Sequence, residues 1–403
     1  MYEIMSADEA IRLIRDGDCI CVNSFVGIEN PTELHEALYR RYQKMQSPTH
    51  LTIVSSAGFG VWDDEHNAEG YIREGAVDKL ICGHFGAMMS TKKLVLEDRF
   101  EAYNLPLGCI SHAIRAQAGG LPGALSKVGL DIFVDPRREG PGINRISIDD
   151  SLVKHVEVDG DEFLYYKLPK ITIAMIKGTA ADRKGNITFD DMFMSGDALS
   201  ICQAVKANRG KVIVQVDRLV ATPSRPRNAI IPGCLVDAIV VAEPQERNEA
   251  YTALTGSFEI PYKEWHTWNE KINDLSQKQR KNNIPANIIG KRAAQELRVD
   301  DIVNIGIGIP ETVARFARKS GMLDMITLTV ESGGIGGFPV SGEAFGAMIG
   351  AASVYDMANQ FDLYDNGGLD VCFMGALEVD KYGNINAHRG TGAFAGIGGF
   401  ANI

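Results

Sequence analysis

Short apolar runs alternate with amphipathic segments along the first half of the chain. Four of these runs have the composition of buried strands, at residues 19–22, 51–54, 171–176 and 212–216. Ser6 and Glu9 form the pattern of a capping box at the start of a helix, and Pro31 favours a second helix start. Cys19 and Cys21 alternate with apolar residues and should share one face of their strand. The alternation of strands and helices predicts an α/β fold with a mostly parallel sheet.

This pattern breaks off after about residue 245 and restarts near residue 286. The stretch between is polar and charged with little periodicity, which is typical of a linker. Beyond it we expect a helix at 291–297, a strand at 301–305, a helix from Glu311 and a strand at 325–330. The sequence therefore predicts an N-terminal domain of residues 1–245, a linker of residues 246–285 and a C-terminal domain of residues 286–403.

Two segments of the first half recur, in the same order, in the second half. Leu51–Gly60 resembles Leu328–Gly337, and Asp182–Ile187 resembles Asp380–Ile385. Each D-x-x-G-N-I segment alone is an ordinary turn signal between strands, so the shared order of the two matches is what counts. The recurrence predicts two homologous open α/β domains of unequal length rather than a solenoid.

Composition narrows the class of protein. The chain has 403 residues, of which 45% are hydrophobic and 23% charged, as expected for a globular protein of two or three domains. Its net charge of -11 disfavours nucleic-acid binding, although local basic groups and backbone amides can still bind a phosphate-bearing molecule. No run approaches the ~20 apolar residues of a membrane helix, and no secretory leader is recognised. We therefore expect a cytoplasmic protein with neither a membrane nor a nucleic-acid partner.

Common catalytic and metal-binding motifs are missing from the sequence. The seven cysteines include no C-x-x-C pair and the eight histidines no H-E-x-x-H motif, so we expect neither disulfides nor a metal site. There is no G-x-S-x-G elbow, and Gly306–Glu311 lacks the third glycine of a dinucleotide-binding loop. His84 stands between two glycines, where a structural histidine is the commoner explanation. Solvated helix or turn positions account for Glu343, Glu378 and Asp380.

Glu331 stands at the end of the predicted strand 325–330, and four of the next six residues are glycines. Ligands of open α/β sheets bind beyond the carboxyl ends of the strands. Glycine backbone lets a bulky substrate approach closely and offers N–H groups to an oxyanion. The pattern by itself leaves two interpretations open: Glu331 is a reactive carboxylate at the sheet edge, or a solvated residue before a flexible loop.

Specific motifs occur along the whole chain, at Ser24–Gly27, Gly83–Gly86, Ala102–Asn104, Val128–Gly129, Phe133–Arg137, Gly185–Phe189, Gly306–Gly308, Glu331–Gly337, Gly367–Asp370 and Gly396–Phe400. Together they resemble family I coenzyme A transferases, specifically the fused single-chain acetate/propionate CoA-transferase type. The resemblance implies two α/β domains of the CoA-transferase or NagB-RpiA-like fold, assembled as a homodimer or homotetramer. Chains of this family continue past the G-I-G-G-F motif, so we expect a second domain that stops at Ile403 to be incomplete.

The resemblance also implies roles for individual residues. Glu331 would be the nucleophile, and the backbone at Ile307, Gly308, Gly398 and Gly399 would line the acyl and oxyanion pocket. CoA contacts are expected at the glycines Gly27, Gly333, Gly334, Gly336, Gly367 and Gly368, whose backbone amides can bind phosphate groups. For the turn at Gly27, an ordinary strand-to-helix turn is an equally open interpretation. Coenzyme A is expected as a substrate together with small carboxylic acids, and no permanently bound cofactor is expected.

The expected reaction moves CoA between a short-chain acyl-CoA and a free carboxylic acid, with acetate as the first candidate. Attack by the Glu331 carboxylate gives a mixed anhydride, and the released thiolate then forms a glutamyl-CoA thioester, with ping-pong kinetics. Because a carboxylate is ordinarily ionised at pH 7, no general base is expected to act on it. Two alternatives remain: an acyl-CoA hydrolase that admits water to the same intermediate, and a non-catalytic ligand-binding module of the same fold.

Overall fold

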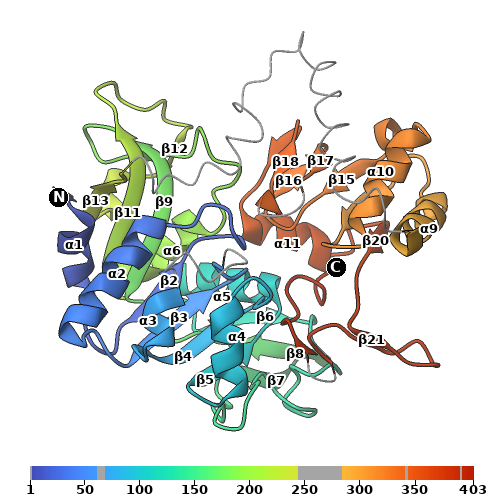
Figure 1. Ribbon diagram of the computed structural model, residues 1–403, viewed down its shortest axis with the longest axis horizontal. Coiled ribbons are helices and arrows are strands. Elements are labelled where there is room, and N and C mark those ends of the chain that lie inside the picture. The colour runs from blue at the N-terminus through green and yellow to red at the C-terminus, as the bar shows by residue number, and fades with distance from the viewer. Residues whose placement is uncertain (1, 61–68, 244–283, 341–343, 391–392) are drawn as a thin grey trace.

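The computed structural model describes residues 2–60, 69–243, 284–340, 344–390 and 393–403. The described chain forms two α/β bodies that lie against each other, one from residues 2–243 and one from residues 284–403 (Figure 1). The predicted linker lies outside these residues apart from its last two positions, and so does Glu343. No helix in the described ranges is long and apolar enough to cross a membrane.

A large parallel sheet forms the centre of the first body. Its strands are β1 (Glu3–Met5), β2 (Cys19–Val22), β3 (Leu51–Ser55), β4 (Val77–Cys82), β5 (Glu101–Asn104), β9 (Ile173–Ala181), β10 (Ile187–Thr188), β11 (Lys211–Leu219), β12 (Ala229–Ile231) and β13 (Ala238–Val241). Every neighbouring pair along the order β1-β13-β11-β9-β2-β3-β4-β5 is parallel. Only β10 and β12 pair antiparallel. The predicted parallel sheet is confirmed.

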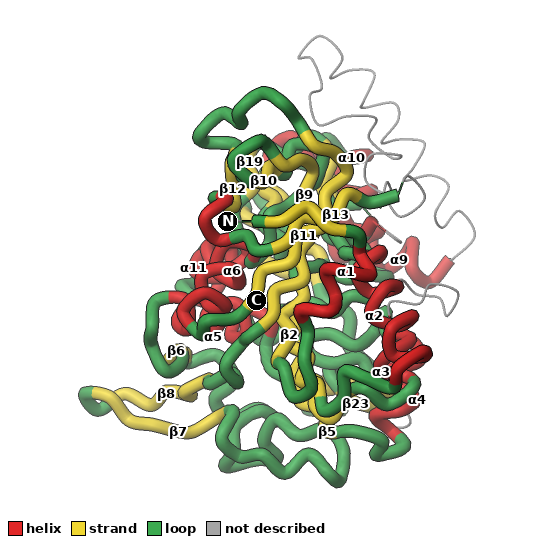
Figure 2. Tube along the Cα trace, turned by 90° about the vertical axis from the view of Figure 1, so that its left-hand side faces the viewer, coloured by secondary structure: helices red, strands yellow, loops and turns green. Residues whose placement is uncertain are grey.

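Helices cover both faces of this sheet (Figure 2). They are α1 (Ala7–Ala10), α2 (Thr32–Met45), α3 (Gly70–Arg73), α4 (Met89–Leu96), α5 (Leu107–Ala118) and α6 (Ala198–Ala207), with 3-10 turns η1 (Ile11–Leu13) and η3 (Gly233–Leu235). The predicted capping box forms at α1, where Ser6 and Glu9 bond each other's backbone N–H. In β2, Cys19 and Cys21 join the core on the α5–α6 side, whereas the residues between and after them face α1 and α2.

A small antiparallel sheet extends from the first body, in the order β6-β8-β7. Its strands are β6 (Ala124–Ser126), β7 (Val153–Val158) and β8 (Asp161–Tyr166). The β7–β8 hairpin projects from the molecule in Figure 2. Only its base is anchored, because Leu164 and Tyr166 are buried in the core beneath α5.

The second body contains a smaller sheet in the order β19-β16-β15-β14-β20. Its strands are β14 (Ile302–Ile305), β15 (Thr327–Thr329), β16 (Gly334–Ile335), β19 (Ser353–Val354) and β20 (Val371–Phe373). The pairs of β14 with β15 and β20 are parallel, while β16 pairs antiparallel with β15 and β19. The helices are α9 (Ile284–Ala293), α10 (Glu311–Lys319) and α11 (Met357–Asp365), with 3-10 turns η6 (Ala294–Glu296) and η7 (Met322–Met325). Three two-stranded hairpins complete it: β17 (Phe338–Pro339) with β18 (Met348–Ile349), β21 (Glu378–Val379) with β22 (Ile385–Asn386), and β23 (Arg389–Gly390) with β24 (Ala393–Phe394).

Two elements of the second body differ from the sequence prediction. The strand expected at 325–330 is only β15, because the preceding residues form the 3-10 turn η7 and a tight turn begins at Val330. The helix expected at 291–297 is α9, which begins earlier, at Ile284. Pro285 does not prevent this start, since the first turn of a helix needs no N–H donor there. The predicted start of α10 at Glu311 is confirmed.

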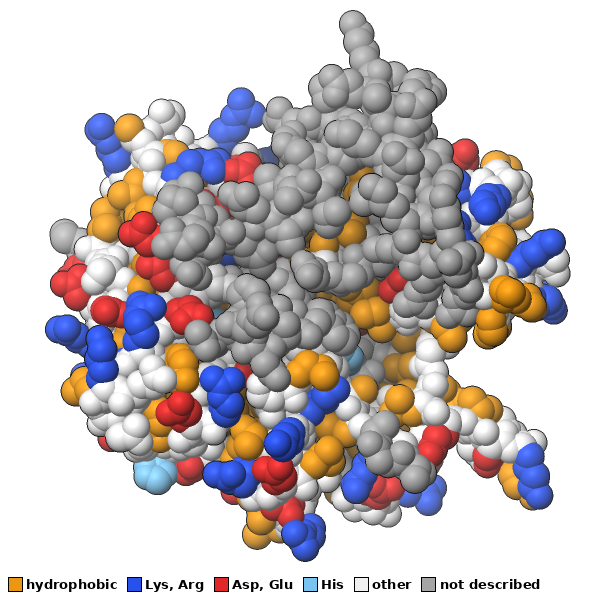
Figure 3. All heavy atoms as spheres, in the orientation of Figure 1, with side chains coloured by type: hydrophobic (Ala, Val, Ile, Leu, Met, Phe, Trp, Pro, Cys, Tyr) orange, Lys and Arg blue, Asp and Glu red, His pale blue; other side chains and the backbone are white. Residues whose placement is uncertain are grey.

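The two D-x-x-G-N-I segments form the same turn in different surroundings. In each, the aspartate Oδ1 accepts from the backbone N–H groups two and four residues on, and its Oδ2 accepts from the asparagine side chain. Ile187 of the first turn is fully buried in the large sheet, whereas Ile385 of the second is 46% exposed. The second turn belongs to the β21–β22 hairpin, which stands out from the surface (Figures 1 and 3). The local repeat is therefore present, but only the first copy is packed.

The two bodies share an interface along α5 and α11. Arg115 of α5 binds Asp362 of α11 through two hydrogen bonds of 2.9 Å, and His112 lies 3.0 Å from the same carboxylate. A common apolar core lies beside these contacts, formed by Phe25 and Leu107 from the first body and Phe361 from the second. A site between the two bodies is therefore held by packing from both.

Candidate active site

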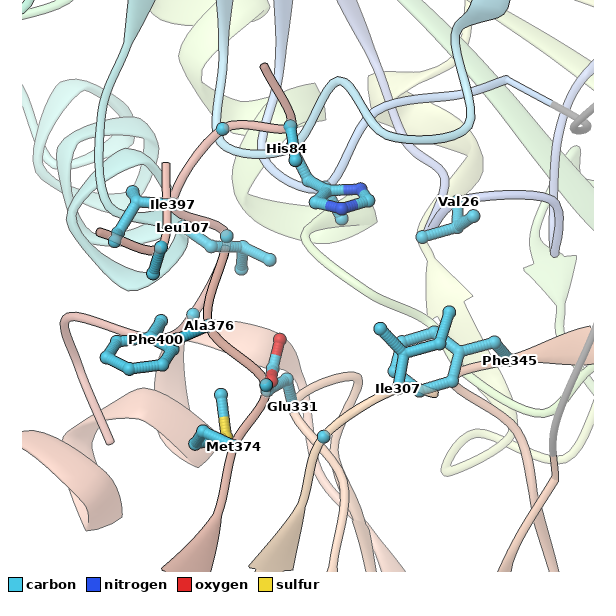
Figure 4. Close-up of a pocket in the computed structure, with 18 of the residues that line it drawn as sticks. Val26, His84, Leu107, Ile307, Glu331, Phe345, Met374, Ala376, Ile397 and Phe400 are labelled. Carbon is cyan, nitrogen blue, oxygen red and sulfur yellow. The ribbon is translucent and has the colours of Figure 1, made fainter. Parts of the chain in front are cut away.

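A pocket of about 300 Å³ lies where the two bodies meet (Figure 4). The first body contributes Phe25, Val26, Ala57, His84 and Leu107. The second body contributes Gly306, Ile307, Glu331, Phe345, Met374–Leu377, Ala387 and Ala395–Phe400. Most of this lining is apolar, so the pocket is a place of low polarity that can exclude water from a reactive group. Among the described residues that line it, Glu331 is the single acidic one.

Glu331 occupies the position that the sequence predicts, just beyond β15. A tight turn follows it, in which the Gly333 N–H donates to the Val330 carbonyl and the Val330 N–H donates to the Gly334 carbonyl. Gly333 has a φ of 117°, and a Cβ atom there would lie 2.1 Å from the carbonyl oxygen of Tyr355. This position accepts only glycine. The turn directs the Glu331 side chain into the pocket (Figure 4).

Burial changes the acidity of Glu331. The side chain keeps some accessible surface inside the pocket, and among the described residues it has no hydrogen-bond partner. Desolvation by the surrounding protein raises the pKa of Glu331 from 4.5 to about 7. The sequence analysis expected a carboxylate that is ordinarily ionised at pH 7, whereas burial brings its pKa close to neutrality, so part of the protein holds a proton there. The physical reason is that no positive charge or hydrogen-bond donor among the described residues offsets the loss of water.

A late loop of the second body closes the pocket against the first body. Its backbone bonds the first body at several points: Phe85 N–H to Ala395 O (2.7 Å), Gly398 N–H to Gly83 O (2.7 Å) and Leu107 N–H to Gly398 O (2.9 Å). The side chain of Asn104 accepts from the Ile397 N–H, and that of Asn402 accepts from the Gly108 N–H. These bonds fix the loop across the interface and position its glycines beside Glu331.

Gly399 lies close to the Glu331 carboxyl group. A Cβ atom on Gly399 would lie 2.7 Å from both the carboxyl carbon and Oε2 of Glu331, too close for any other residue without a shift. The Gly398 amide is occupied by its bond to Gly83, whereas the Gly399 N–H makes no hydrogen bond to a described residue. Of the glycine pair, Gly399 is therefore the one with a donor to offer.

The structure brings together some of the predicted pocket residues and not others. Ile307, Gly398 and Gly399 line the pocket with Glu331. Gly308 does not, because its N–H donates to the Glu311 carboxylate at 2.8 Å. We attribute this to the start of α10, where Glu311 bonds back to the preceding turn.

The predicted CoA-contacting glycines lie outside the pocket lining. Gly333, Gly334 and Gly336 shape the turn and strand after Glu331, and Gly336 N–H donates to the Leu328 carbonyl. Gly367 and Gly368 end α11, where their N–H groups donate to the carbonyls of Tyr364 and Leu363. Gly27 belongs to the turn after β2, next to two lining residues. The geometry gives these glycines structural roles, and their contact with CoA stays a prediction.

Several lining residues carry no signal that sequence analysis could have used. Val26 has a φ of 53°, which is uncommon for a branched side chain and is seen mainly where surrounding structure enforces it. Phe345 and Met374 come from segments that share no sequence motif and meet only in the folded protein. His84 did carry a signal, its place between two glycines.

An α/β chain whose two bodies enclose a desolvated glutamate beside a glycine loop has the architecture of an acyl-transferring enzyme. The family model for coenzyme A transferase matches residues 4–242 and 286–393. The chain belongs to the coenzyme A transferase family.

Relatives of known function support this assignment. Acetate CoA-transferase YdiF of Escherichia coli (strain K12) is 38% identical over 99% of this chain and 74% of its own length. Caffeate CoA-transferase of Acetobacterium woodii is 35% identical over 100% of this chain and 76% of its own length. The crystal structure of the acyl-CoA transferase YdiF from E. coli O157:H7, a thioester complex with CoA, superposes with a TM-score of 0.85 at 34% identity. It is matched over 100% of this chain and 74% of that chain.

These similarities define the enzyme class. The protein is a CoA-transferase, acting between acyl-CoA thioesters and carboxylic acids. The relatives' names differ in the acid, acetate in one and caffeate in the other, at similar identity. The acid used by this chain is therefore a separate question from its class.

Proposed function

We propose that Glu331 carries CoA between a short-chain acyl-CoA and a free acid, with acetate as the preferred acid. The Glu331 carboxylate attacks the thioester carbonyl, a carbon–oxygen bond forms, and the carbon–sulfur bond breaks to release CoA as thiolate. The thiolate then attacks the glutamyl carbonyl of the anhydride and releases the acid, which leaves Glu331 as a CoA thioester. A second acid attacks this thioester, and the same steps run in reverse.

One observation carries this proposal: Glu331 is a desolvated acid without a hydrogen-bond partner among the described residues, and it faces an apolar pocket. A desolvated carboxylate is a better nucleophile than a hydrated one, because no water shell has to be removed before attack. The apolar walls also keep water from the anhydride, which would otherwise hydrolyse. This favours transfer over hydrolysis.

Stabilisation of the developing oxyanion is the second requirement. Each attack converts a carbonyl into a tetrahedral oxyanion, and donors aimed at that oxygen lower the barrier. Gly399 lies beside the Glu331 carboxyl group, and its N–H has no partner among the described residues. We assign the Gly399 N–H as an oxyanion donor. From the sequence, both Gly398 and Gly399 were expected in this part of the site.

Initial-rate kinetics test this proposal. Varying acyl-CoA at several acetate concentrations should give the parallel reciprocal plots of a ping-pong mechanism. Borohydride should inactivate the enzyme after incubation with acyl-CoA alone and not before, because only the thioester on Glu331 is reducible. Intersecting plots together with full resistance to borohydride would exclude a covalent intermediate.

The competing reaction is acyl-CoA hydrolysis through the same intermediate. Thioester loss should be fast with acetate present and much slower without an acceptor acid. Equal rates in the two conditions would identify a hydrolase. Propionate, butyrate and caffeate as acceptors then rank the acids, since one methylene changes discrimination by only about 1–3 kcal/mol. The expected homo-oligomer, a dimer or tetramer, is tested separately by light scattering.

A further inference from the structure

His84 is a polar group on the pocket wall that the proposed mechanism does not use. It follows β4, and its ring lines the pocket on the side opposite Glu331 (Figure 4). The ring is held between two glycines: a Cβ atom on Gly86 would lie 2.4 Å from its Cε1, and one on Gly398 would lie 3.8 Å from its Cδ2. The ring therefore has a fixed position beside the same glycine pair that contacts Glu331.

The hydrogen-bonding capacity of His84 is unused. Its Nδ1 is fully buried without a partner, and Nε2 forms no hydrogen bond to any described residue. Burial, together with the charge of Lys92, lowers the pKa of His84 to about 4, so the ring is neutral at the pH of any assay near neutrality. A neutral imidazole carries one proton. If this proton is on Nε2, the buried Nδ1 is an unpaired acceptor rather than an unpaired donor. The Nε2–H then points toward the side where Gly86 leaves space.

A neutral donor suits this position better than a charged one. Apart from Glu331, the other side chains that line the pocket are apolar, among them Phe25, Leu107 and Ile397. A cation opposite Glu331 would lower the pKa that desolvation raises and would hold the substrate acid too tightly. A neutral N–H orients the substrate through a directional hydrogen bond and adds no charge to the pocket.

We propose that the Nε2–H of His84 donates a hydrogen bond to the carbonyl oxygen of the acyl group while Glu331 attacks it. This inference rests on the proposed role of Glu331. During attack, the Glu331 oxygen bonds the carbonyl carbon, the electron pair of the C=O moves onto oxygen, and the N–H bonds that oxygen without transferring its proton. The pair returns when the carbon–sulfur bond breaks and CoA leaves as thiolate. His84 thus acts with Gly399, one donor from each body.

Substitution of His84 by Leu and by Gln tests the donor. H84L removes the N–H from the pocket wall, and kcat should fall about 100-fold, the usual effect of losing one such donor. Because the bond is to the carbonyl common to all acyl groups, the fall should be alike for acetate, propionate and butyrate, with KM changed only a few-fold. H84Q keeps an N–H donor and should recover at least tenfold of the loss. If H84L does not fold, H84M, which also lacks a donor, replaces it in the comparison with H84Q.

His35 supplies the matched control. It is also fully buried, its pKa is lowered by burial to about 3, and its Nε2 also lacks a partner, but it stacks between Phe59 and Tyr71 outside the pocket. H35L should lower the melting temperature and leave kcat per folded molecule unchanged.

Intact-protein mass separates a failure of this inference from a failure of Glu331. Wild type mixed with acyl-CoA should gain CoA, and H84L should gain it about 100-fold more slowly. Absence of the adduct in wild type would remove the role of Glu331 itself. Adduct formation at the wild-type rate in H84L, or equal losses in H84L and H84Q, would overturn the role of His84 alone.

Discussion

Glu331 and Glu29 are both buried glutamates that follow a strand, one in each body, and their surroundings are opposite. Burial raises the pKa of each to about 7. Glu29 accepts a hydrogen bond from the Phe193 N–H at 2.9 Å and lies near the buried ammonium of Lys177. No described residue donates a hydrogen bond to Glu331 or places a cation near it, and its side chain faces the pocket.

The difference shows what makes a buried acid reactive. A raised pKa is shared by Glu29 and by the proposed nucleophile Glu331, so the pKa alone identifies the role of neither. Glu29 is satisfied inside the protein, and its oxygens are occupied by the chain itself. The carboxylate oxygens of Glu331 can instead form a bond to a ligand in the pocket. The unmet partner and the access to the pocket, not the acidity, single out Glu331.

The largest expected difference between the two is in activity. E331Q keeps the shape of the side chain but replaces the nucleophile with an amide, so kcat should fall by roughly 10⁴- to 10⁶-fold. E29Q should retain kcat within about tenfold per folded molecule. Steady-state rates with acetate and an acyl-CoA measure both. A folded E29Q as inactive as E331Q would remove the distinction between the two sites.

The next largest loss of kcat should come from filling the space beside Glu331. G399A places a methyl group 2.7 Å from the carboxyl carbon and displaces the nucleophile. A misplacement of about 1 Å can cost 100-fold in rate, so we expect a fall of that order in kcat. G375A is the matched control, because its Cβ atom would meet only the Ile307 carbonyl at 3.9 Å and should cause a much smaller change. Equal effects of the two variants would contradict the close approach.

The pH dependence of kcat/KM should report Glu331 and not Glu29. Only the ionised carboxylate attacks, so the rate should fall about tenfold per pH unit below a midpoint near 7. His84, with a pKa of about 4, lies outside this range. E29Q should keep the same midpoint. A midpoint near the ordinary 4.5 would show that Glu331 is solvated.

Stability should show the same pH trend for both glutamates. Because the pKa of Glu331 is raised on folding, the folded state binds its proton more tightly, and stability decreases as pH rises from about 4.5 to about 7. E331Q removes this cost and should be more stable than wild type at pH 8, by at most about 3 kcal/mol, with little difference at pH 4. The pKa of Glu29 is raised to about 7 as well, so E29Q should also gain stability relative to wild type between pH 4 and pH 8. Urea unfolding at both pH values measures this, and a variant whose stability relative to wild type is the same at pH 4 and pH 8 would contradict it.

Local sequence chemistry accounted for much of the fold. The strand at Cys19–Val22, the capping box at Ser6 and the helix start at Glu311 were all predictable, because each depends on a few neighbouring residues. Elements whose limits depend on packing were not predictable from the sequence. The shortness of β15 and the exposure of the second D-x-x-G-N-I turn follow from what lies beside them in space, which no local pattern records.

The residues of the site also divide into those that the sequence could predict and those that it could not. Glu331 and the pair Gly398–Gly399 were predictable, because their motifs are continuous in sequence. Val26, Phe345 and Met374 were not, since the pocket joins segments hundreds of residues apart, and the backbone of Val26 is set by the turn that holds it. The raised pKa of Glu331 was missed for the same reason: desolvation is a property of the assembled pocket.

Peptide mapping after incubation with acyl-CoA and no acceptor acid shows which residue carries CoA. CoA should be attached to the peptide that contains Glu331, in wild type and in E29Q but not in E331Q, and should be lost when acetate is added. CoA found on another residue, or an unmodified Glu331 in a protein that turns over acyl-CoA, would contradict the role of Glu331 as the nucleophile.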